Sequence, residues 1–453
     1  MEPSRANTTL LTNGLILTHP GLSQPVPHGV TMISGNQLER VNWPRNSADW
    51  PATEVVDCSN CLIMPGLINA HTHAAMSILR GVADDLPLDR WLNRYIFPSE
   101  NKHVAPDFVR LGTMLSAVEM ALSGVTTFAD GYFFMEQAAR ATAEVGLRAV
   151  IAQGILDVPT PDAPVPGFWK GRAEEFLASC PRHSLITPAL FCHSPYLCSP
   201  ETFRGAKELA GKHDALLFSH VSETSREVEE IQRIYGLSPV EHLEREGILG
   251  RDFVAVHCVH LSEPEKDILS KTGVGVVHCP ESNMKLSSGA APVVDLLAKG
   301  VHLALGTDGP ASNNNLDLFE EMRSASFMAK LVNNDPEALS ACVVMQMATM
   351  DGAVVLGMND RIGSLESGKL ADLIIIDLDR AHLTPAYDVV SHLVYAARGS
   401  DVRDVMVDGR FVVRHGKVTT VDEGELKSKV REMAGKIASD LDIRTHGVCT
   451  NDV

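Results

Sequence analysis

The sequence predicts an α/β protein: a (β/α)8 TIM barrel with a small β-sandwich domain formed from both termini. The middle of the chain alternates apolar, β-rich segments with segments of helical periodicity, as parallel strands joined by crossover helices do. Both ends contain short β-rich runs and turn residues instead. The length of 453 residues suits a large barrel and a smaller domain.

The β-rich ends set the expected domain boundaries. We expect residues 1–64 to form the N-terminal part of the sandwich, residues 65–363 the barrel, and residues 364–453 the C-terminal part with a final helix. Short β-rich runs return at Ala371–Asp379 and Val402–Lys417, where Asp408-Gly409 is a strong hairpin signal. Helical spacing resumes between Glu423 and Asp442.

Eight apolar segments of the middle region are the predicted barrel strands. They are Leu62–His71, Val125–Asp130, Leu147–Leu156, Leu185–Cys192, Ala215–His220, Phe253–His257, Val274–His278 and Val301–Thr307. Helical patterns occur at Phe108–Ser123, Glu201–His213, Glu227–Ile234 and Asp317–Leu331. Nearly continuous apolar strands are typical of a sheet that is buried on both faces.

Ionisable residues follow or close nearly all of these strands. In chain order they are His71 and His73, Asp130, His193, His220, His257, His278 and Asp308. The carboxyl ends of barrel strands meet at one face, where active sites lie. Packing alone does not explain so many ionisable groups at the ends of apolar strands, so we expect an active site there.

Four of these residues are the predicted metal ligands. His71 and His73 are two apart at a strand end, so their side chains point to the same face. His220 ends the fifth strand, and Asp308 follows the eighth in Gly306-Thr-Asp-Gly. Three imidazoles and one carboxylate suit Zn²⁺ or Fe²⁺ with a position left for water. We expect one divalent metal, Zn²⁺ ahead of Fe²⁺.

Glu223, His257 and His193 are the predicted reactive neighbours of the metal. Glu223 follows His220 by three residues, although an acid in the first turn of the next helix is the alternative. His257 closes its strand, whereas His260 falls in the following loop and is expected to be structural. His193 would bind metal or substrate.

Composition excludes several classes of function. A formal charge of −18 disfavours a polyanion such as nucleic acid. The chain has no apolar run of about 18 residues and no signal-peptide pattern, so we expect neither a membrane span nor export. Nine scattered Cys suggest reduced thiols in the cytoplasm. A small, neutral or weakly charged substrate fits best.

Several motifs resemble the amidohydrolase superfamily, in its aminohydrolase branch. They are Pro65-Gly-Leu-Ile-Asn-Ala-His-Thr-His, Ser219-His-Val-Ser-Glu-Thr, His257-Cys-Val-His-Leu and Leu305-Gly-Thr-Asp-Gly. Met76–Leu92, His193–Ser199, Ser282–Leu286 and Gly309–Asn314 resemble the 5′-methylthioadenosine/S-adenosylhomocysteine deaminase family. The second set is shared in part with triazine hydrolases and guanine deaminases.

The resemblance implies a role for each candidate residue. His71, His73, His220 and Asp308 would hold one metal, while Glu223 and His257 would flank the attacking water and the purine edge. His193 would contact the purine and Glu100 the ribose hydroxyls. Trp91 and the loop around Leu86 would cover the 5′ side.

The same resemblance implies hydrolytic deamination of the adenine ring of 5′-methylthioadenosine, and of adenosine or S-adenosylhomocysteine, to an inosine-type product and ammonia. We expect the metal to lower the pKa of water from about 15.7 to about 7. Asp308 would accept the water proton and pass it to the leaving amine, Glu223 would protonate N1, and His257 would steady the attacking hydroxyl.

The chain departs from the family at the end of the third strand. Members that take a 5′ group with a carboxylate have an Arg there, and this chain has Gln153. A neutral amide cannot pair with a carboxylate in the bidentate way that Arg does, and Arg172 is the only substitute we identify. We therefore expect methylthioadenosine or adenosine to be preferred over S-adenosylhomocysteine.

The alternatives share the barrel but not the substrate. Another heterocycle deaminase or hydrolase would act on guanine, cytosine or a triazine, and a catalytically dead barrel would serve as a scaffold. A cyclic amidase of the dihydropyrimidinase type would need a Lys where the fourth strand ends in His193. The zinc deaminases of nucleic-acid bases need a P-C-x-x-C motif that His242-Leu-Glu lacks. A homodimer is expected from the fold.

Overall fold

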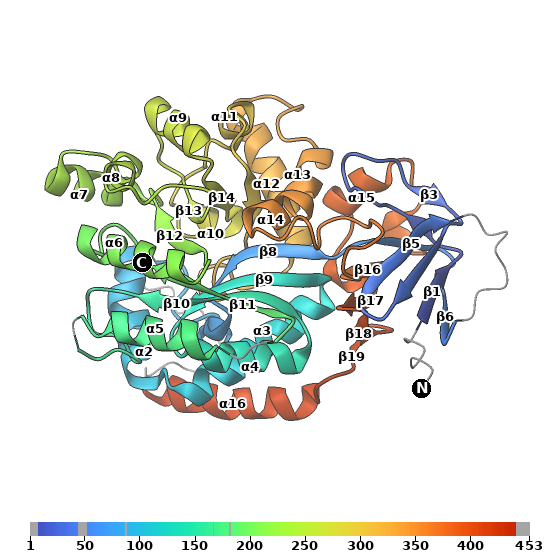
Figure 1. Cartoon of the computed structure of the whole chain (residues 1–453), viewed down its shortest axis with the longest axis horizontal. Helices are drawn as coiled ribbons and strands as arrows, with labels where there is room; N and C mark the ends of the chain where they lie inside the picture. Colours follow the sequence, from blue (N-terminus) through green and yellow to red (C-terminus); the bar gives the residue numbers. More distant parts are fainter. Residues whose placement is uncertain (1–7, 44–51, 87, 166, 181–182, 441–453) are drawn as a thin grey trace.

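Eight parallel strands form the central sheet of the protein. The computed structural model describes residues 8–43, 52–86, 88–165, 167–180 and 183–440. Figure 1 shows the sheet at the centre of the molecule, with its strands adjacent in chain order. The strands are β8 (Leu67–Thr72), β9 (Val125–Tyr132), β10 (Arg148–Ile155), β11 (Ile186–Cys192), β12 (Leu217–Val221), β13 (Phe253–His257), β14 (Gly275–His278) and β15 (Leu303–Leu305). Asp308 N donates to His71 O at 3.1 Å, which ties the last strand to the first, and the predicted barrel is confirmed.

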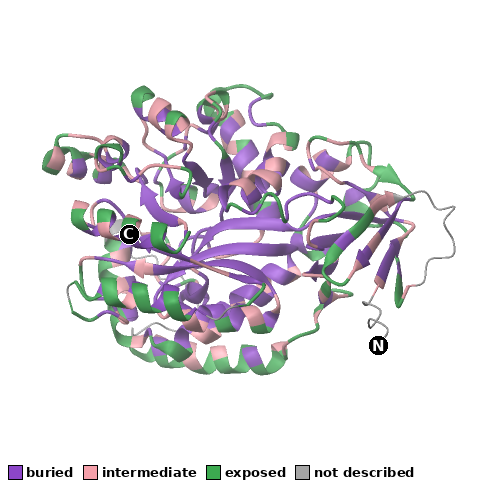
Figure 2. Ribbon diagram, viewed as in Figure 1, coloured by how far each residue is buried: buried purple, intermediate pink, exposed green. Residues whose placement is uncertain are grey.

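Helices cover the outside of the barrel in the described part of the chain. They are α3 (Pro106–Leu122), α4 (Met135–Val145), α5 (Trp169–Ser179), α6 (Pro200–Lys212), α7 (Ser225–Tyr235), α8 (Pro239–Arg245), α9 (Glu263–Thr272), α10 (Pro280–Lys285), α11 (Val293–Ala298), α12 (Leu318–Asn333), α13 (Ala341–Met347), α14 (Met350–Val355) and α15 (Val389–Tyr395). Helix α16 (Glu423–Asp440) runs along the outside and contacts α3 (Figure 1). Because both faces of the sheet are covered, every residue of β9, β12 and β13 is buried (Figure 2).

The segment between β8 and α3 is helical and lies over one side of the barrel mouth. It contains η1 (Ala74–Leu79), α1 (Leu88–Trp91), the π-helical turn η2 (Leu92–Ile96) and α2 (Phe97–His103). A π-helical turn is frequent at functional sites because it shifts side chains out of the regular helical register. No helix of the described residues is long and apolar enough to cross a membrane.

Strands from both ends of the chain lie in one sheet beside the barrel. Its order is β19-β18-β17-β16-β7-β2-β3, and a second sheet has the order β5-β4-β1-β6. The strands are β1 (Thr8–Thr12), β2 (Leu15–Ile16), β3 (Val26–Pro27), β4 (Val30–Ser34), β5 (Gln37–Trp43), β6 (Glu54–Asp57), β7 (Cys61–Pro65), β16 (Leu373–Asp377), β17 (Val402–Val407), β18 (Arg410–Arg414) and β19 (Lys417–Val418). Asp408 and Gly409 turn between β17 and β18 with φ of 50° and 75°, as a two-residue hairpin requires. The domain boundaries themselves stay a prediction.

The predicted first strand, Leu62–His71, is wrong as a single element, because the chain changes sheets at Gly66. Strand β7 pairs with β16 in the sandwich sheet, and β8 pairs with β9 in the barrel. Gly66 N donates to Asp372 O at 3.1 Å, and Leu67 N donates to Gly124 O at 3.0 Å. A Cβ at Gly66 would lie 2.1 Å from the Thr126 side chain. Since both strands are buried and apolar, the hydrophobic pattern gives no sign of the switch.

Candidate active site

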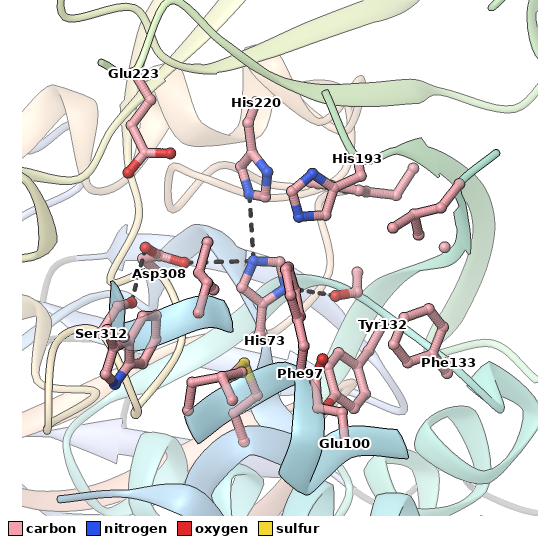
Figure 3. Close-up of a pocket in the computed structure, with 18 of the residues that line it drawn as sticks. His73, Phe97, Glu100, Tyr132, Phe133, His193, His220, Glu223, Asp308 and Ser312 are labelled. Carbon is pink, nitrogen blue, oxygen red and sulfur yellow. Dashed lines mark hydrogen bonds and ion pairs between the residues drawn. The ribbon is translucent and has the colours of Figure 1, made fainter. Parts of the chain in front are cut away.

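A pocket at the carboxyl ends of the barrel strands collects most of the predicted site residues (Figure 3). Strand ends supply most of its polar lining residues, and the segment after β8 supplies Trp91, Leu92, Ile96 and Phe97 together with Glu100. The lining residues are His73, Met76, Trp91, Leu92, Ile96, Phe97, Glu100, Gly131, Tyr132, Phe133, Gly154, Leu156, Phe191, His193, Tyr196, His220, Glu223, His257, Leu286, Asp308 and Ser312.

His71, His73, His220 and Asp308 converge at the floor of this pocket. One ligand atom from each lies within 4.8 Å of the others. Nε2 of His73 is 3.3 Å from Nε2 of His220 and 3.4 Å from Oδ1 of Asp308. Oδ1 of Asp308 is also 3.5 Å from Nε2 of His71. The four side chains therefore surround one point, as the ligands of a single metal ion do.

The protonation of these residues fits a divalent metal. Nδ1 of His73 donates to Gly131 O at 2.5 Å, so its proton is on that atom and Nε2 faces the cluster bare. Nε2 of His71 is buried without a hydrogen-bond partner, and burial lowers the pKa of His71 to about 4. Burial also holds the pKa of His220 well below its usual value. Bare imidazole nitrogens are typical metal ligands, so these four residues could hold one divalent metal ion.

Asp308 is held in place by a dense set of hydrogen bonds. Its Oδ2 accepts from Ser282 Oγ at 2.6 Å and Ser312 Oγ at 2.8 Å, and its Oδ1 accepts from Gly309 N at 2.7 Å. Its backbone has φ of 61°, a left-handed conformation that aspartate adopts at a cost. Burial alone would raise the pKa of Asp308, but contacts with His71 and the nearby His73 and His257 hold that pKa well below its usual range.

Glu223 and His257 face each other beside the ligand cluster. Glu223 Oε2 lies 3.8 Å from His257 Nε2, and Ser288 Oγ donates to Glu223 Oε1 at 3.5 Å. Burial raises the pKa of Glu223, which favours its protonated form. Nδ1 of His257 donates to the side-chain oxygen of Asn283 at 3.0 Å. The site thus pairs an ionised carboxylate, Asp308, with a carboxyl that tends to stay protonated.

A family-wide comparison agrees with this geometry. A sequence profile described as the amidohydrolase family matches residues 62–412. The chain belongs to the amidohydrolase family.

Curated relatives narrow the place of this amidohydrolase in its family. It is 45% identical over 439 residues to a 5-methylthioadenosine/S-adenosylhomocysteine deaminase of Syntrophobacter fumaroxidans, covering 96% of this chain and 100% of the relative. It is 42% identical over 436 residues to a 5′-deoxyadenosine deaminase of Methanothermobacter thermautotrophicus, covering 95% and 98%. The chain thus belongs with the 5-methylthioadenosine/S-adenosylhomocysteine deaminases, as its motifs indicated.

Solved structures confirm the fold of this amidohydrolase. An adenosine deaminase of Xanthomonas campestris with bound zinc superposes with a TM-score of 0.93 at 36% identity, covering 96% of this chain and 100% of that chain. A zinc complex of the atrazine chlorohydrolase TrzN of Arthrobacter aurescens superposes with a TM-score of 0.86 at 22% identity, covering 94% and 100%. The second likeness concerns the fold alone.

His193, Glu100 and Trp91 also line the pocket of this amidohydrolase. The His193 ring centroid lies 4.9 Å from that of His220, and burial lowers the pKa of His193 to about 3. Tyr132 donates its hydroxyl to Glu100 Oε1 at 2.6 Å, and burial raises the pKa of Glu100 to about 7. Trp91 Nε1 donates to Val82 O at 3.1 Å, so the indole is anchored to the segment that precedes it. Leu86 packs against the core and is not a lining residue.

Gln153 and Arg172 are not among the residues that line the pocket. Gln153 Nε2 donates to Asp162 Oδ2 at 2.9 Å, and Arg172 Nε lies 3.3 Å from the same oxygen. Arg172 also forms an ion pair with Glu136. The Asp162 side chain is only 1% exposed. The side chains of Gln153 and Arg172 bind this buried carboxylate and therefore lie outside the pocket.

Sequence reasoning missed Ser282, Ser312 and Asn283. They lie in two motifs that carried the family likeness, but a Ser or Asn has no spacing signature of its own. Outside the metal-ligand cluster, two predicted strand-end residues, Asp130 and His278, do not line the pocket. Asp130 Oδ1 accepts from Ala74 N at 2.8 Å, and His278 is buried with both ring nitrogens unpartnered.

Proposed function

We propose that this amidohydrolase removes the 6-amino group of adenine nucleosides by hydrolysis, with 5′-methylthioadenosine as the preferred substrate. One observation carries the proposal: the metal cluster and the Glu223–His257 pair open into the same pocket as Glu100, a buried carboxylate on the segment after β8. The metal cluster and the Glu223–His257 pair suit the attack of water at a ring carbon. Glu100 offers an acceptor for sugar hydroxyls. The 5-methylthioadenosine/S-adenosylhomocysteine deaminase and 5′-deoxyadenosine deaminase relatives support the same chemistry.

The residues of the site divide the proton transfers between them. A divalent metal, when bound, supplies a water whose pKa is lowered to about 7. The Asp308 carboxylate accepts a proton from the attacking water and later gives it to the departing amine. Glu223, whose pKa is raised by burial, donates a proton to N1 of the purine so that charge leaves the ring. His257 hydrogen bonds the attacking oxygen, and His193 contacts the purine.

We propose Zn²⁺ as the resident metal, a cytoplasmic location and a homodimer. The three-His, one-Asp ligand set supports Zn²⁺, and Fe²⁺ is the alternative. The proposed deamination is tested by measuring ammonia release from 5′-methylthioadenosine, with guanine, cytosine and a triazine as comparison substrates. We expect methylthioadenosine to turn over and chelation to abolish the reaction. Turnover of guanine, cytosine or the triazine instead would overturn the substrate proposal.

The pocket favours an apolar 5′ group over an amino-acid tail. Among the described residues no Lys or Arg lines it, and its walls include Phe97, Phe133 and Leu156. An S-adenosylhomocysteine carboxylate would enter without a cationic partner, and a missing charged hydrogen bond costs about 1.5–3 kcal/mol. We expect kcat/KM for methylthioadenosine and 5′-deoxyadenosine to exceed that for S-adenosylhomocysteine by roughly tenfold or more. Equal values would contradict this selectivity.

Binding of the nucleoside should weaken as the pH falls through 7. The buried Glu100 carboxyl has its pKa raised to about 7, so it is ionised above that pH and protonated below it. Ribose hydroxyls donate more strongly to the ionised form. We expect KM for methylthioadenosine to rise about tenfold between pH 8 and pH 6, and to be high and flat in Glu100→Gln. A flat KM in the wild type would remove Glu100 from the ribose site.

A further inference from the structure

Glu227, four residues after the proton donor, binds two consecutive peptide N–H groups. Ser222 N donates to Glu227 Oε1 at 2.9 Å, and Glu223 N donates to Glu227 Oε2 at 2.8 Å. Glu227 is only 3% exposed, so both bonds are shielded from water. Burial raises the pKa of Glu227 to about 8, and each of its two carboxyl oxygens accepts from one of these peptide N–H groups. Glu227 thus fixes the backbone from which the Glu223 side chain projects.

The peptide that Glu227 binds is strained and is held from its other side as well. Ser222 has φ of 53°, a left-handed conformation that serine adopts only when its surroundings impose it. Its carbonyl oxygen accepts from Val259 N at 3.1 Å and from His260 N at 2.9 Å. These donors follow His257 in the chain. The loop after β12 carries Glu223, and the loop after β13 begins directly after His257. The peptide between Ser222 and Glu223 joins these two loops, and Glu227 binds it from the other side.

We propose that Glu227 is a positioning residue that sets the place of the Glu223 carboxyl opposite His257. The inference rests on the proposed role of Glu223 as proton donor. Glu227 lies in the first turn of α7, where its backbone N–H donates to the capping Thr224 Oγ1 at 3.2 Å. A purely helix-capping role would affect stability alone, whereas positioning affects turnover, and the two are separable by experiment.

The decisive variant is Glu227→Gln, compared with a matched control at another helix. A Gln keeps one acceptor but turns an amide donor toward the second peptide N–H, so the segment must shift. We expect kcat to fall about 10- to 100-fold, since small misplacements of catalytic groups have effects of that size. KM should stay within about twofold of the wild-type value, because the residues proposed to contact the ribose are unchanged. The bound metal should be retained, because the metal-ligating residues are unchanged.

The control is Glu265→Gln in α9. Glu265 is 2% exposed and accepts from Ser262 N at 2.8 Å, the same kind of buried contact at a helix start, but it holds no residue that lines the pocket. Glu265 accepts through Oε2 alone and its Oε1 has no hydrogen-bond partner, so a Gln can keep the acceptor, and we expect only Glu227→Gln to lower kcat. An unchanged kcat in Glu227→Gln, or an equal fall in both variants, would overturn the proposal.

Two further measurements keep the proposal open to refutation. Should Glu227→Gln fail to fold, Glu227→Asp is the second variant. It keeps the carboxyl group on a shorter side chain, so we expect a kcat below that of the wild type. A wild-type kcat in Glu227→Asp would overturn the proposal. A crystal structure of Glu227→Gln should show the Glu223 carboxyl displaced from its 3.8 Å approach to His257. An undisplaced Glu223 overturns the proposal whatever the activity. Absence of ammonia release by the wild type would instead refute the proposed function.

Discussion

Replacing Glu223 with Gln should nearly abolish turnover while leaving the metal in place. Gln is close to Glu in size, so the contact with Ser288 Oγ and the approach to His257 keep their spacing. It cannot deliver an acidic proton to N1, and a positioned general acid contributes about 10²- to 10⁴-fold. We expect kcat to fall by roughly that factor, measured as ammonia release. Bound metal, measured by elemental analysis, should match the wild type.

The control for this variant is Glu229→Gln, on helix α7, which follows Glu223 in the chain. Glu229 is exposed and does not line the pocket, so its removal should leave kcat within about twofold. A fully active Glu223→Gln would remove Glu223 as the proton donor. A fall in activity that tracks loss of metal would show instead that the substitution disturbs His220.

Replacing Arg148 with Met should destabilise the whole protein. Arg148 lies on β10 at the bottom of the barrel, and Asp372 lies next to β16 in the sandwich sheet. Arg148 Nε and Nη2 donate to the two Asp372 carboxylate oxygens at 2.6 Å and 3.1 Å, and each side chain is 1% exposed. Removing the guanidinium leaves a buried carboxylate unpaired, which costs about 3–5 kcal/mol. The free energy of unfolding, measured by urea denaturation, should fall by that amount, and the midpoint should move to a lower urea concentration.

A surface ion pair provides the comparison for Arg148. Arg204 lies 2.9 Å from Glu201, and their side chains are 48% and 76% exposed. Arg204→Met should therefore cost less than about 1 kcal/mol. Equal midpoints for the two variants would mean that the Arg148 contact contributes little beyond its packing. Because the Arg148 pair is far from the pocket-lining residues, kcat of the folded variant should be unchanged.

Most of the fold could be predicted from local patterns in the sequence. The strand Phe253–His257 has the bounds that the sequence predicts. The predicted first strand is divided at Gly66, and the other barrel strands differ by a few residues at their ends. The helical segment predicted from Glu423 ends at Asp440 in the described residues. Apolar runs and helical periodicity depend on neighbouring residues, so they are visible without tertiary structure.

The ligand set was also visible, because position along a barrel strand fixes position in the site. A residue that ends an apolar barrel strand lies at the carboxyl face, so His71, His73, His220 and Asp308 were expected to meet. The structure brings them together, with Glu223 and His257 beside them. Glu100 came from the family likeness alone, because the sequence pattern suggested only an acid in a loop, whereas the structure places it in α2.

The sequence by itself determined the barrel, the metal ligands and the order of the catalytic loops, since each follows from periodicity and strand ends. Only the tertiary structure decided which side chains reach the pocket. Gln153 and Arg172 turn to the buried Asp162, and Glu227 binds the backbone of Glu223. These contacts depend on which buried polar group lies next to a side chain in the folded protein. The spacing of residues along the chain does not predict such neighbours.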